Sequence, residues 1–288
     1  MELIKAENMP NDFTICDMSD FHLGSPNCAE ETLRETVAAI AKEKNCYVIF
    51  KGDAIEAILP NDKRYLHSAV REGLQSPKQQ ADKVVEIFTP IRDRILAWGI
   101  GNHELKLWNT VDFGKYIADG LSAPYGAYNF KITFSGTDGK LMFKTYHTHG
   151  MGGLQSNAKD QIQYEANRRA GLKHKLSKSG HADVVYMSRG HDHQLIVVSP
   201  TAEDQLYLTD DGRGIHQHYR VSPPQNADYI PPDSRWYATT GSFRKLYSAP
   251  GSCVIDYGEV VGYAPSEIGF ALVNVIDKKI VDVRKVVV

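Results

Sequence analysis

The 288-residue sequence predicts an α/β fold. Residues 47–50, 95–98 and 184–187 are apolar or aromatic without polar alternation, as in strands that are buried on both faces. The first of these runs follows a segment with helical spacing of apolar residues, and all three lead into loops that contain glycine. Buried strands that alternate with helices are typical of α/β proteins.

The first strand–helix–strand unit spans residues 13–50. Residues 13–16 predict a short strand, and Asn27, three residues before Glu30, predicts the start of a helix. This helix has apolar residues on one face: Leu33, Val37 and Ile40. The strand over residues 47–50 completes the unit, so the helix is expected to be a crossover between two strands.

Further helix signals follow a weakly patterned segment. Ser76, Pro77 and Gln79 combine an N-cap, a proline in the first turn and a capping-box residue. A helix is therefore predicted to begin there, and Pro90 is expected to kink or end it. A short helix is predicted over residues 112–119.

The second half of the chain begins with a predicted hairpin, residues 130–134 and 141–146, around an Asp-Gly turn. Residues 156–178 are helical in character, with a narrow stripe of small or apolar residues at four-residue spacing: Ala158, Ile162, Ala166 and Ala170. Six basic and two acidic residues give the segment 159–178 a net charge of +4. We interpret it as a solvated helix face that covers the sheet, with nucleic-acid binding as the alternative.

The chain is expected to form one domain, residues 1–288, with a surface insertion at about 200–235, where the sequence becomes polar and rich in proline. Residues 239–242 predict a loop, and residues 268–276 and 280–288 predict strands. No internal repeat is visible.

Composition narrows the class of protein. The chain is 42% hydrophobic and 24% charged, which is ordinary for a globular protein, and its net charge of −2 excludes a uniformly basic surface. The four cysteines are scattered without a C-x-x-C pair, which favours a reducing compartment. The sequence begins without the apolar core of a signal peptide and has no long apolar run, so a soluble, cytoplasmic protein without membrane contact is expected.

Five loops carry metal-binding side chains, and each follows a strand-like run. In chain order the candidates are Asp20, His22, Asp53, Glu56, Asn102, His103, Glu104, His149, His191 and His193. α/β sheets place their binding sites at the carboxyl ends of strands. Carboxylate, imidazole and amide-oxygen ligands suit Mn²⁺, Fe or Zn²⁺. The sequence therefore predicts a metal-dependent site.

The chain resembles the calcineurin-like metallophosphoesterases in five ordered motifs over residues 20–193. These are Asp20-x-His22, Gly52-Asp53-x-x-Glu56, Gly101-Asn102-His103-Glu104, His149-Gly150 and Gly190-His191-x-His193. Gly241-Ser242 resembles a pair that often follows in this superfamily, and the overall look is similar to phage- or prophage-type members. The resemblance implies a four-layer αββα sandwich of two mixed β-sheets flanked by helices.

The resemblance also implies two divalent ions, with Mn²⁺ expected and Fe, Zn²⁺ or Ni²⁺ as alternatives. One ion would be held by Asp20, His22, Asp53 and His193, and the other by Asp53, Asn102, His149 and His191. Asp53 would bridge the ions, and a hydroxide between them would be the nucleophile. His103 would donate a proton to the leaving group, with Glu56 as the acid that orients its ring.

The remaining titratable residues have ordinary interpretations. Surface or turn positions are expected for five histidines: His67, His174, His181, His216 and His218. His147 shares a strand face with His149, but the family pattern places the ligand at His149. Asp17 and Asp192 are expected to cap loops, and Glu104 either orients a side chain or caps.

The predicted function is hydrolysis of a phosphodiester, with nucleic acid as a candidate substrate, because the Gly-His-x-His pair is typical of nuclease- and phosphodiesterase-type members. A phosphatase or phosphodiesterase that acts on a small nucleotide is the alternative. A scaffold that has lost its metals is disfavoured because no ligand of the motif set is missing.

Overall fold

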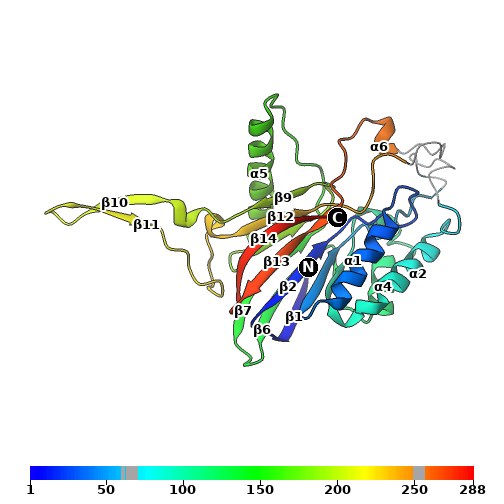
Figure 1. Ribbon diagram of the computed structural model, residues 1–288, viewed down its shortest axis with the longest axis horizontal. Coiled ribbons are helices and arrows are strands. Elements are labelled where there is room, and N and C mark those ends of the chain that lie inside the picture. Colours follow the sequence, from blue (N-terminus) through cyan, green and yellow to red (C-terminus); the bar gives the residue numbers. More distant parts are fainter. Residues whose placement is uncertain (60–61, 63–70, 249–256) are drawn as a thin grey trace.

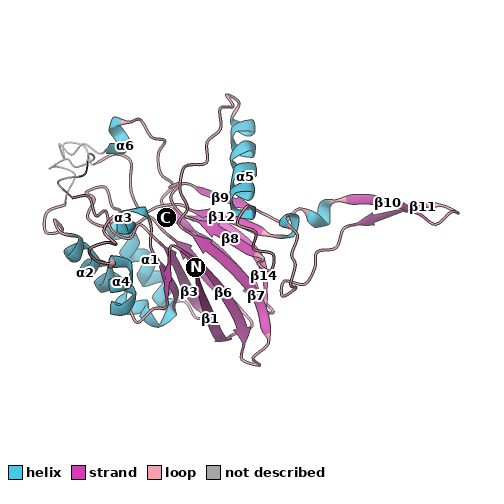
Figure 2. Cartoon of the chain, turned by 180° about the vertical axis from the view of Figure 1, so that it is seen from behind, coloured by secondary structure: helices cyan, strands magenta, loops and turns pink. Residues whose placement is uncertain are grey.

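Two mixed six-stranded sheets pack face to face, with helices on their outer faces (Figures 1 and 2). The computed structural model describes residues 1–59, 62, 71–248 and 257–288. Stacked phenylalanines, including Phe13, Phe134 and Phe143, fill the space between the sheets. The predicted four-layer αββα sandwich is confirmed.

The first sheet has the spatial order β14-β13-β2-β3-β4-β5. Its strands β2 to β5 are parallel, and β13 and β14 extend it with antiparallel pairs. The strands are β2 (Phe13–Met18), β3 (Cys46–Lys51), β4 (Ile95–Gly99), β5 (Tyr125–Ala127), β13 (Gly269–Ile276) and β14 (Lys279–Val287).

The second sheet has the order β1-β6-β7-β8-β12-β9. The predicted hairpin forms its β6–β7 pair, and β7, β8 and β12 run parallel to one another. The strands are β1 (Glu2–Met9), β6 (Asn129–Gly136), β7 (Leu141–Thr148), β8 (Tyr186–Arg189), β9 (Leu195–Val198) and β12 (Trp236–Thr240).

The outer layers are unequal. α1 (Glu30–Lys42), α2 (Pro77–Phe88) and α4 (Phe113–Gly120) cover the first sheet, and α5 (Gln161–Ser177) covers the second (Figure 1). The short helices are α3 (Asn102–Leu105), α6 (Tyr257–Val260) and the 3₁₀ turns η2 (Thr89–Arg94), η3 (Ala202–Asp204) and η4 (Pro232–Ser234).

Local helix signals hold at most of the predicted positions. Ser76 caps α2 with the full capping box, and the helix ends at Phe88, where a 3₁₀ turn that contains Pro90 begins. The predicted start at Asn27 is wrong, because α1 begins at Glu30 and the Asn27 amide donates to the carbonyl of Leu246. A distant segment therefore takes up the side chain that sequence proximity had assigned to a cap.

The predicted stripe on α5 is also wrong. The helix begins only at Gln161, and Ile162 is 81% exposed, whereas Leu172 and Leu176 are buried against the second sheet. Two leucines bury more apolar surface than a row of alanines, so they decide which face packs.

Several strands form by pairing with distant segments, and local sequence patterns do not predict them. Residues 239–240 were expected in a loop, but they belong to β12 because they pair with β8 and β9. Within the segment 200–235, β10 (Leu206–Asp210) and β11 (Ile215–Tyr219) form a hairpin that projects from the body (Figures 1 and 2). None of the described helices combines the length and apolar character that crossing a membrane requires.

Candidate metal centre

The predicted ligands meet at one edge of the sandwich. Asp20, Asp53 and Asn102 follow the parallel strands β2, β3 and β4, and His149 and His191 follow the parallel strands β7 and β8. The carboxyl ends of both parallel sets thus open onto the same site, which is where such sheets bind ligands.

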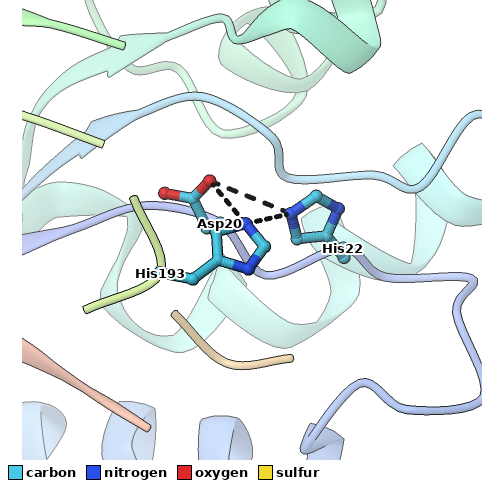
Figure 3. Close-up of side chains that lie close together, drawn as sticks. All are labelled: Asp20, His22 and His193. Carbon is cyan, nitrogen blue, oxygen red and sulfur yellow. Dashed lines mark hydrogen bonds and ion pairs between the residues drawn. The ribbon is translucent and has the colours of Figure 1, made fainter. Parts of the chain in front are cut away.

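Asp20, His22 and His193 form the first group of facing donors (Figure 3). The Nε2 atoms of the two histidines are 3.1 Å apart, and Asp20 Oδ1 lies 3.3 Å from His193 Nε2 and 3.8 Å from His22 Nε2. Asp20 is fully buried, and among the described residues its Oδ1 has no hydrogen-bond partner. A buried carboxylate oxygen in this state is costly without a cation nearby.

Asp53 lies between the two groups of donors. Its Oδ2 is 3.8 Å from His22 Nε2 and 3.3 Å from His149 Nε2, while its Oδ1 accepts the main-chain N–H of His103. The side chain is buried. One carboxylate oxygen therefore faces donors from both sheets.

Asn102, His149 and His191 complete the second group. Asn102 Oδ1 lies 3.0 Å from His149 Nε2 and 2.8 Å from His191 Nδ1. Asp53, His149 and His191 also lie close enough together to hold one ion. All seven predicted ligands are thus brought into one cluster.

Hydrogen bonds at the far nitrogens fix two of the imidazole rings. His22 Nδ1–H donates to Glu56 Oε2 over 2.8 Å, and His149 Nδ1–H donates to the carbonyl of Lys51 over 3.1 Å. Each Nε2 then presents a lone pair to the carboxylates of Asp20 and Asp53, which also offer only lone pairs. Such an arrangement needs cations between the atoms, and the donors fit divalent metal ions.

The pKa values of the clustered histidines and aspartates also indicate that positive charge is favoured between them. Burial alone would lower the pKa of His22, but Glu56 and Asp20 raise it to about 10. Burial is likewise outweighed at His149, where Asp53 raises the pKa to about 9. The neighbouring histidines hold the pKa of Asp53 below its usual range, despite burial. In the absence of metal, protons would occupy the places of the cations.

His103 lies beside the cluster. Its ring is buried, its Nε2 is 3.9 Å from Asp53 Oδ2, and its Nδ1–H donates to the main-chain carbonyl of Glu56. The Glu56 carboxylate, which was expected to orient His103, instead hydrogen-bonds His22. The main chain of Glu56 thus orients His103, and its side chain orients a candidate ligand.

Glu104 joins two of the site loops. Its carboxylate accepts the N–H groups of Gly101 and Asp53 over 2.8 and 3.0 Å, and that of Ile55 over 3.1 Å. Of the two roles considered for Glu104, the structure shows capping of main-chain N–H groups. The Glu104 carboxylate thereby fixes the position of the loop after β3 relative to the loop after β4.

The site loops are strained. Asp20, His22, Asp53, His191 and His193 all have positive φ angles between 50° and 73°. Such residues cost about 1–3 kcal/mol each and persist only where surrounding contacts hold them. At Gly101 a Cβ atom would lie 2.1 Å from Asp53 Oδ1, so only glycine allows the loop after β4 to approach Asp53.

His147 and Asp17 lie beneath the site. His147 is fully buried between Thr145 and Ser188, with both ring nitrogens hydrogen-bonded, which agrees with the choice of His149 as the ligand. Asp17 was expected to cap a loop, but it belongs to β2 and forms a buried ion pair with Lys51. The strand is longer than its apolar run predicted, so the carboxylate stays inside.

The remaining residues with ordinary interpretations are Asp192 and five histidines. Asp192 caps as expected, accepting the N–H of Leu154 over 2.8 Å. His174, His216 and His218 are exposed and His181 is half-buried. His67 lies outside the described residues.

A cavity of about 430 Å³ opens over the cluster. Its wall includes Tyr164 and Arg168 from α5, and Arg244 and Tyr263 from the C-terminal part of the chain. Arg244 follows the Gly241-Ser242 pair by two residues and Tyr263 lies near no motif, so the sequence did not predict a role for either. Only their position over the cluster connects them with the site.

The basic residues of α5 have separate surroundings. Lys173 pairs with Asp233, Arg169 lies 3.8 Å from Glu165, and Lys175 donates to loop carbonyls. Arg168 reaches the cavity, where it also donates to the carbonyl of Leu154 over 3.1 Å. The +4 segment is therefore not a continuous basic surface.

Comparisons with known proteins find distant structural similarity. Haemophilus influenzae NAD nucleotidase (NadN) is similar with a TM-score of 0.37 and 14% identity, over 95% of this chain and 49% of that chain. Pseudomonas putida nuclease MPE is similar with a TM-score of 0.32 and 11% identity, over 94% and 87%. The chain spans about half the length of the nucleotidase. No family model and no curated protein matches the chain. At such low identity, neither similarity assigns an activity.

Proposed function

We propose that this protein is a metal-dependent phosphoester hydrolase of the calcineurin-like type. The observation that carries the proposal is the position of Asp53, whose Oδ2 faces His22 from one group of donors and His149 from the other. Two neighbouring cations need a shared anion to offset their repulsion. A buried carboxylate that faces two groups of ligands meets this need.

The residues present fit a pair of divalent ions. Asp20, His22, Asp53 and His193 would hold one ion, and Asp53, Asn102, His149 and His191 the other. The donors are oxygen and nitrogen atoms without a thiolate, which suits Mn²⁺, Fe or Zn²⁺. When bound, the ions would activate water and neutralise the phosphoryl oxygens.

His103 is the proton donor in this proposal. The bond from its Nδ1–H to the Glu56 carbonyl fixes the ring, and the ring lines the cavity beside Asp53. A departing alkoxide needs a proton, and an imidazolium beside a carboxylate can supply it. Glu56 contributes by orienting His22 with its side chain and His103 with its main chain.

The cavity wall favours a substrate that contains a nucleotide. The cavity wall contains the guanidinium groups of Arg168 and Arg244, which suit phosphate oxygens, and the rings of Tyr164 and Tyr263, which suit a base. Arg168 lies over the Tyr164 ring at 5.5 Å. Together with the Gly-His-x-His motif, this supports hydrolysis of a phosphodiester, with nucleic acid as the leading substrate.

A small nucleotide is the second candidate substrate. The observation that favours it is the pairing of the basic residues of α5, which leaves Arg168 directed to the cavity but no continuous track along this helix for a long polynucleotide. A cavity of about 430 Å³ is within the range that encloses a small ligand.

The test is a substrate panel with the Mn²⁺-loaded protein: a nitrophenyl diester, a nitrophenyl monoester, a small nucleotide, single-stranded DNA and duplex DNA. We expect diester hydrolysis that a chelator abolishes and Mn²⁺ restores. Hydrolysis of the monoester and small nucleotide alone would support the second candidate. Metal binding without turnover on any substrate would contradict both.

A further inference from the structure

The hairpin of β10 and β11, here called the arm, has no contact that covers it among the described residues. All ten of its strand residues are exposed, and the arm extends away from both sheets (Figures 1 and 2). A hairpin of two strands is at best marginally stable in water, and three or more strands with an apolar face are needed for stability. Within the part of the chain that the structure describes, the arm therefore lacks a stabilising neighbour.

The two faces of the arm differ. The strand register places four apolar or aromatic residues on one face, with 50% to 74% exposure, together with Gln217 and Asp210: Leu206, Leu208, Ile215 and Tyr219. The other face carries His218, which stacks on Tyr207 at 5.3 Å and hydrogen-bonds Thr209. Antiparallel sheets commonly pack the more apolar of their two faces, and in the arm both faces are exposed.

The hydrogen bonds within the arm show which main-chain groups remain on the outer edge of β11. Arg220 N–H donates to Gln205 O, and Asp211 N–H donates to Gly214 O. In an antiparallel ladder, hydrogen-bonded residues alternate with residues whose N–H and C=O point outward. Counting along β11 from these bonds, Ile215, Gln217 and Tyr219 present outward N–H and C=O groups.

This edge is complementary to itself. If two copies of β11 pair antiparallel around Gln217, Gln217 lies opposite its own copy and Ile215 lies opposite Tyr219 of the other copy. The outward groups of all three residues then meet in register, and no residue from Ile215 to Tyr219 is an acid, a lysine or an arginine. Apolar cross-strand pairs stabilise a sheet, whereas like charges destabilise it.

The edge of β10 is less suitable. Its outward residues are Leu206, Leu208 and Asp210, so the same antiparallel pairing would place the Asp210 carboxylate opposite Leu206 of the other copy. Charged residues protect sheet edges against pairing. The two edges of the arm thus differ in charge: the β10 edge carries the Asp210 carboxylate, and the β11 edge carries no acid, lysine or arginine.

We infer that the arm joins two copies of this chain, through antiparallel pairing of β11 with β11 across a two-fold axis at Gln217. The product is a four-stranded sheet in which Leu206, Leu208, Ile215 and Tyr219 of both copies lie on the same face. Because the contact is the same on both copies, it closes at two and forms a dimer.

Two proline variants test the edge. Gln217→Pro removes an outward N–H from β11 without removing a bond to β10, and Leu208→Pro is the matched change on the β10 edge. Sedimentation velocity should give a dimer for the wild type and for Leu208→Pro, and a monomer for Gln217→Pro. A monomeric wild type, an open-ended polymer, or equal dissociation by both prolines would overturn the proposal.

A cross-link tests the register without weakening the arm. Opposite residues in the proposed pairing have Cα atoms about 5.5 Å apart, which is within reach of a disulfide. Gln217→Cys should therefore give a covalent dimer with an added disulfide oxidant, on a gel without reductant. Leu208→Cys would lie three strand spacings, about 14 Å, from its copy and should not cross-link. The wild type under the same oxidant controls for the native cysteines. Equal cross-linking of the two variants would contradict the register.

Discussion

At the scale of single residues, the site depends on lone pairs that face one another. The Nδ1–H of His22 donates to Glu56 and that of His149 donates to the carbonyl of Lys51, so both rings turn Nε2 toward Asp53. Without cations, this arrangement would be held only by added protons. Substitutions here should therefore change metal content and catalysis in separable ways.

Asp53→Asn should lower the content of both ions and abolish hydrolysis together, because a neutral amide cannot bridge two cations. Elemental analysis and turnover are the measurements. Asp112→Asn is the matched control, since this carboxylate caps α4 and neither belongs to the cluster nor lines the cavity, so its variant should keep both ions. Asn102→Ala should weaken chiefly the second site. Full occupancy and normal turnover in Asp53→Asn would rule out the shared role.

His103→Ala should keep both ions but slow the hydrolysis of nucleoside esters by about 10²–10⁴-fold, the usual contribution of general acid catalysis. The rate of hydrolysis of a nitrophenyl ester should fall much less, because nitrophenolate departs without a proton. Glu56→Gln provides the contrast: its carboxylate holds His22, so it should lower metal occupancy instead. Equal losses of His103→Ala on both leaving groups would exclude proton donation.

At the scale of elements, α5 brings two neighbouring arginines to different surroundings. Arg168 lines the cavity over the cluster, whereas Arg169 lines a neighbouring hollow with Glu165. Of these two residues, Arg168 is the one that lines the cavity over the candidate ligands.

Arg168→Ala should lower kcat/KM on nucleotide esters by about tenfold, the effect of one charged interaction of about 1.4 kcal/mol. On single-stranded DNA, the log–log salt dependence should become shallower by about 0.7 for each phosphate that the variant no longer neutralises. Arg169→Ala is the matched control and should leave both quantities unchanged. Equal effects of the two variants would favour diffuse binding along the helix.

Asp183 connects β6 and β7 by accepting hydrogen bonds from Lys131 and Lys144 over 2.6 and 2.7 Å. Partial burial would raise the pKa of Asp183, but the two lysines lower it to about 2. Because the folded-state pKa lies below the unfolded value, the stabilisation is complete above about pH 4 and is lost as the pH falls toward 2. It contributes about 2 kcal/mol at neutral pH.

Asp183→Asn should therefore lower the free energy of unfolding by about 2 kcal/mol at pH 7. Denaturant unfolding of both proteins measures the difference, which should shrink toward zero between about pH 4 and pH 2. If the difference in the free energy of unfolding stayed constant over this pH range, the charge of the Asp183 carboxylate would not be the source of the stabilisation.

At the scale of the whole molecule, the candidate metal centre lies between the two sheets. Asp20 and Asp53 come from the first sheet, and His149 and His191 come from the second. Ions bound between them would stabilise the packing of the sheets as well as the site.

Removal of metal by a chelator should therefore lower Tm. Ligand at about a hundred times its Kd contributes about 3 kcal/mol, which corresponds to a shift of about 5–10 °C for a protein of this size. Calorimetry with and without added Mn²⁺ measures it. Asp53→Asn should show little response to chelator, and the same shift in that variant would place the stabilising ion elsewhere.

The sequence alone determined the α/β class, the loops that carry the candidate ligands, and the capped helix at Ser76, because each depends on residues that are close in the chain. Five motifs in order also implied the ligand set. The structure brings all seven of those residues together, but their metal-binding role stays a prediction.

Only the tertiary structure decided which partner each side chain meets. Asp17 pairs with Lys51, Glu56 holds His22, and Arg244 reaches the cavity, through contacts between distant segments. The pairing of residues 239–240 with two strands, and the exposed arm, likewise depend on neighbours that local periodicity does not encode. The physical reason is that buried side chains and strand edges find hydrogen-bond partners in segments that are distant in sequence. The spacing of apolar residues indicates only which side chains of a helix or strand are buried.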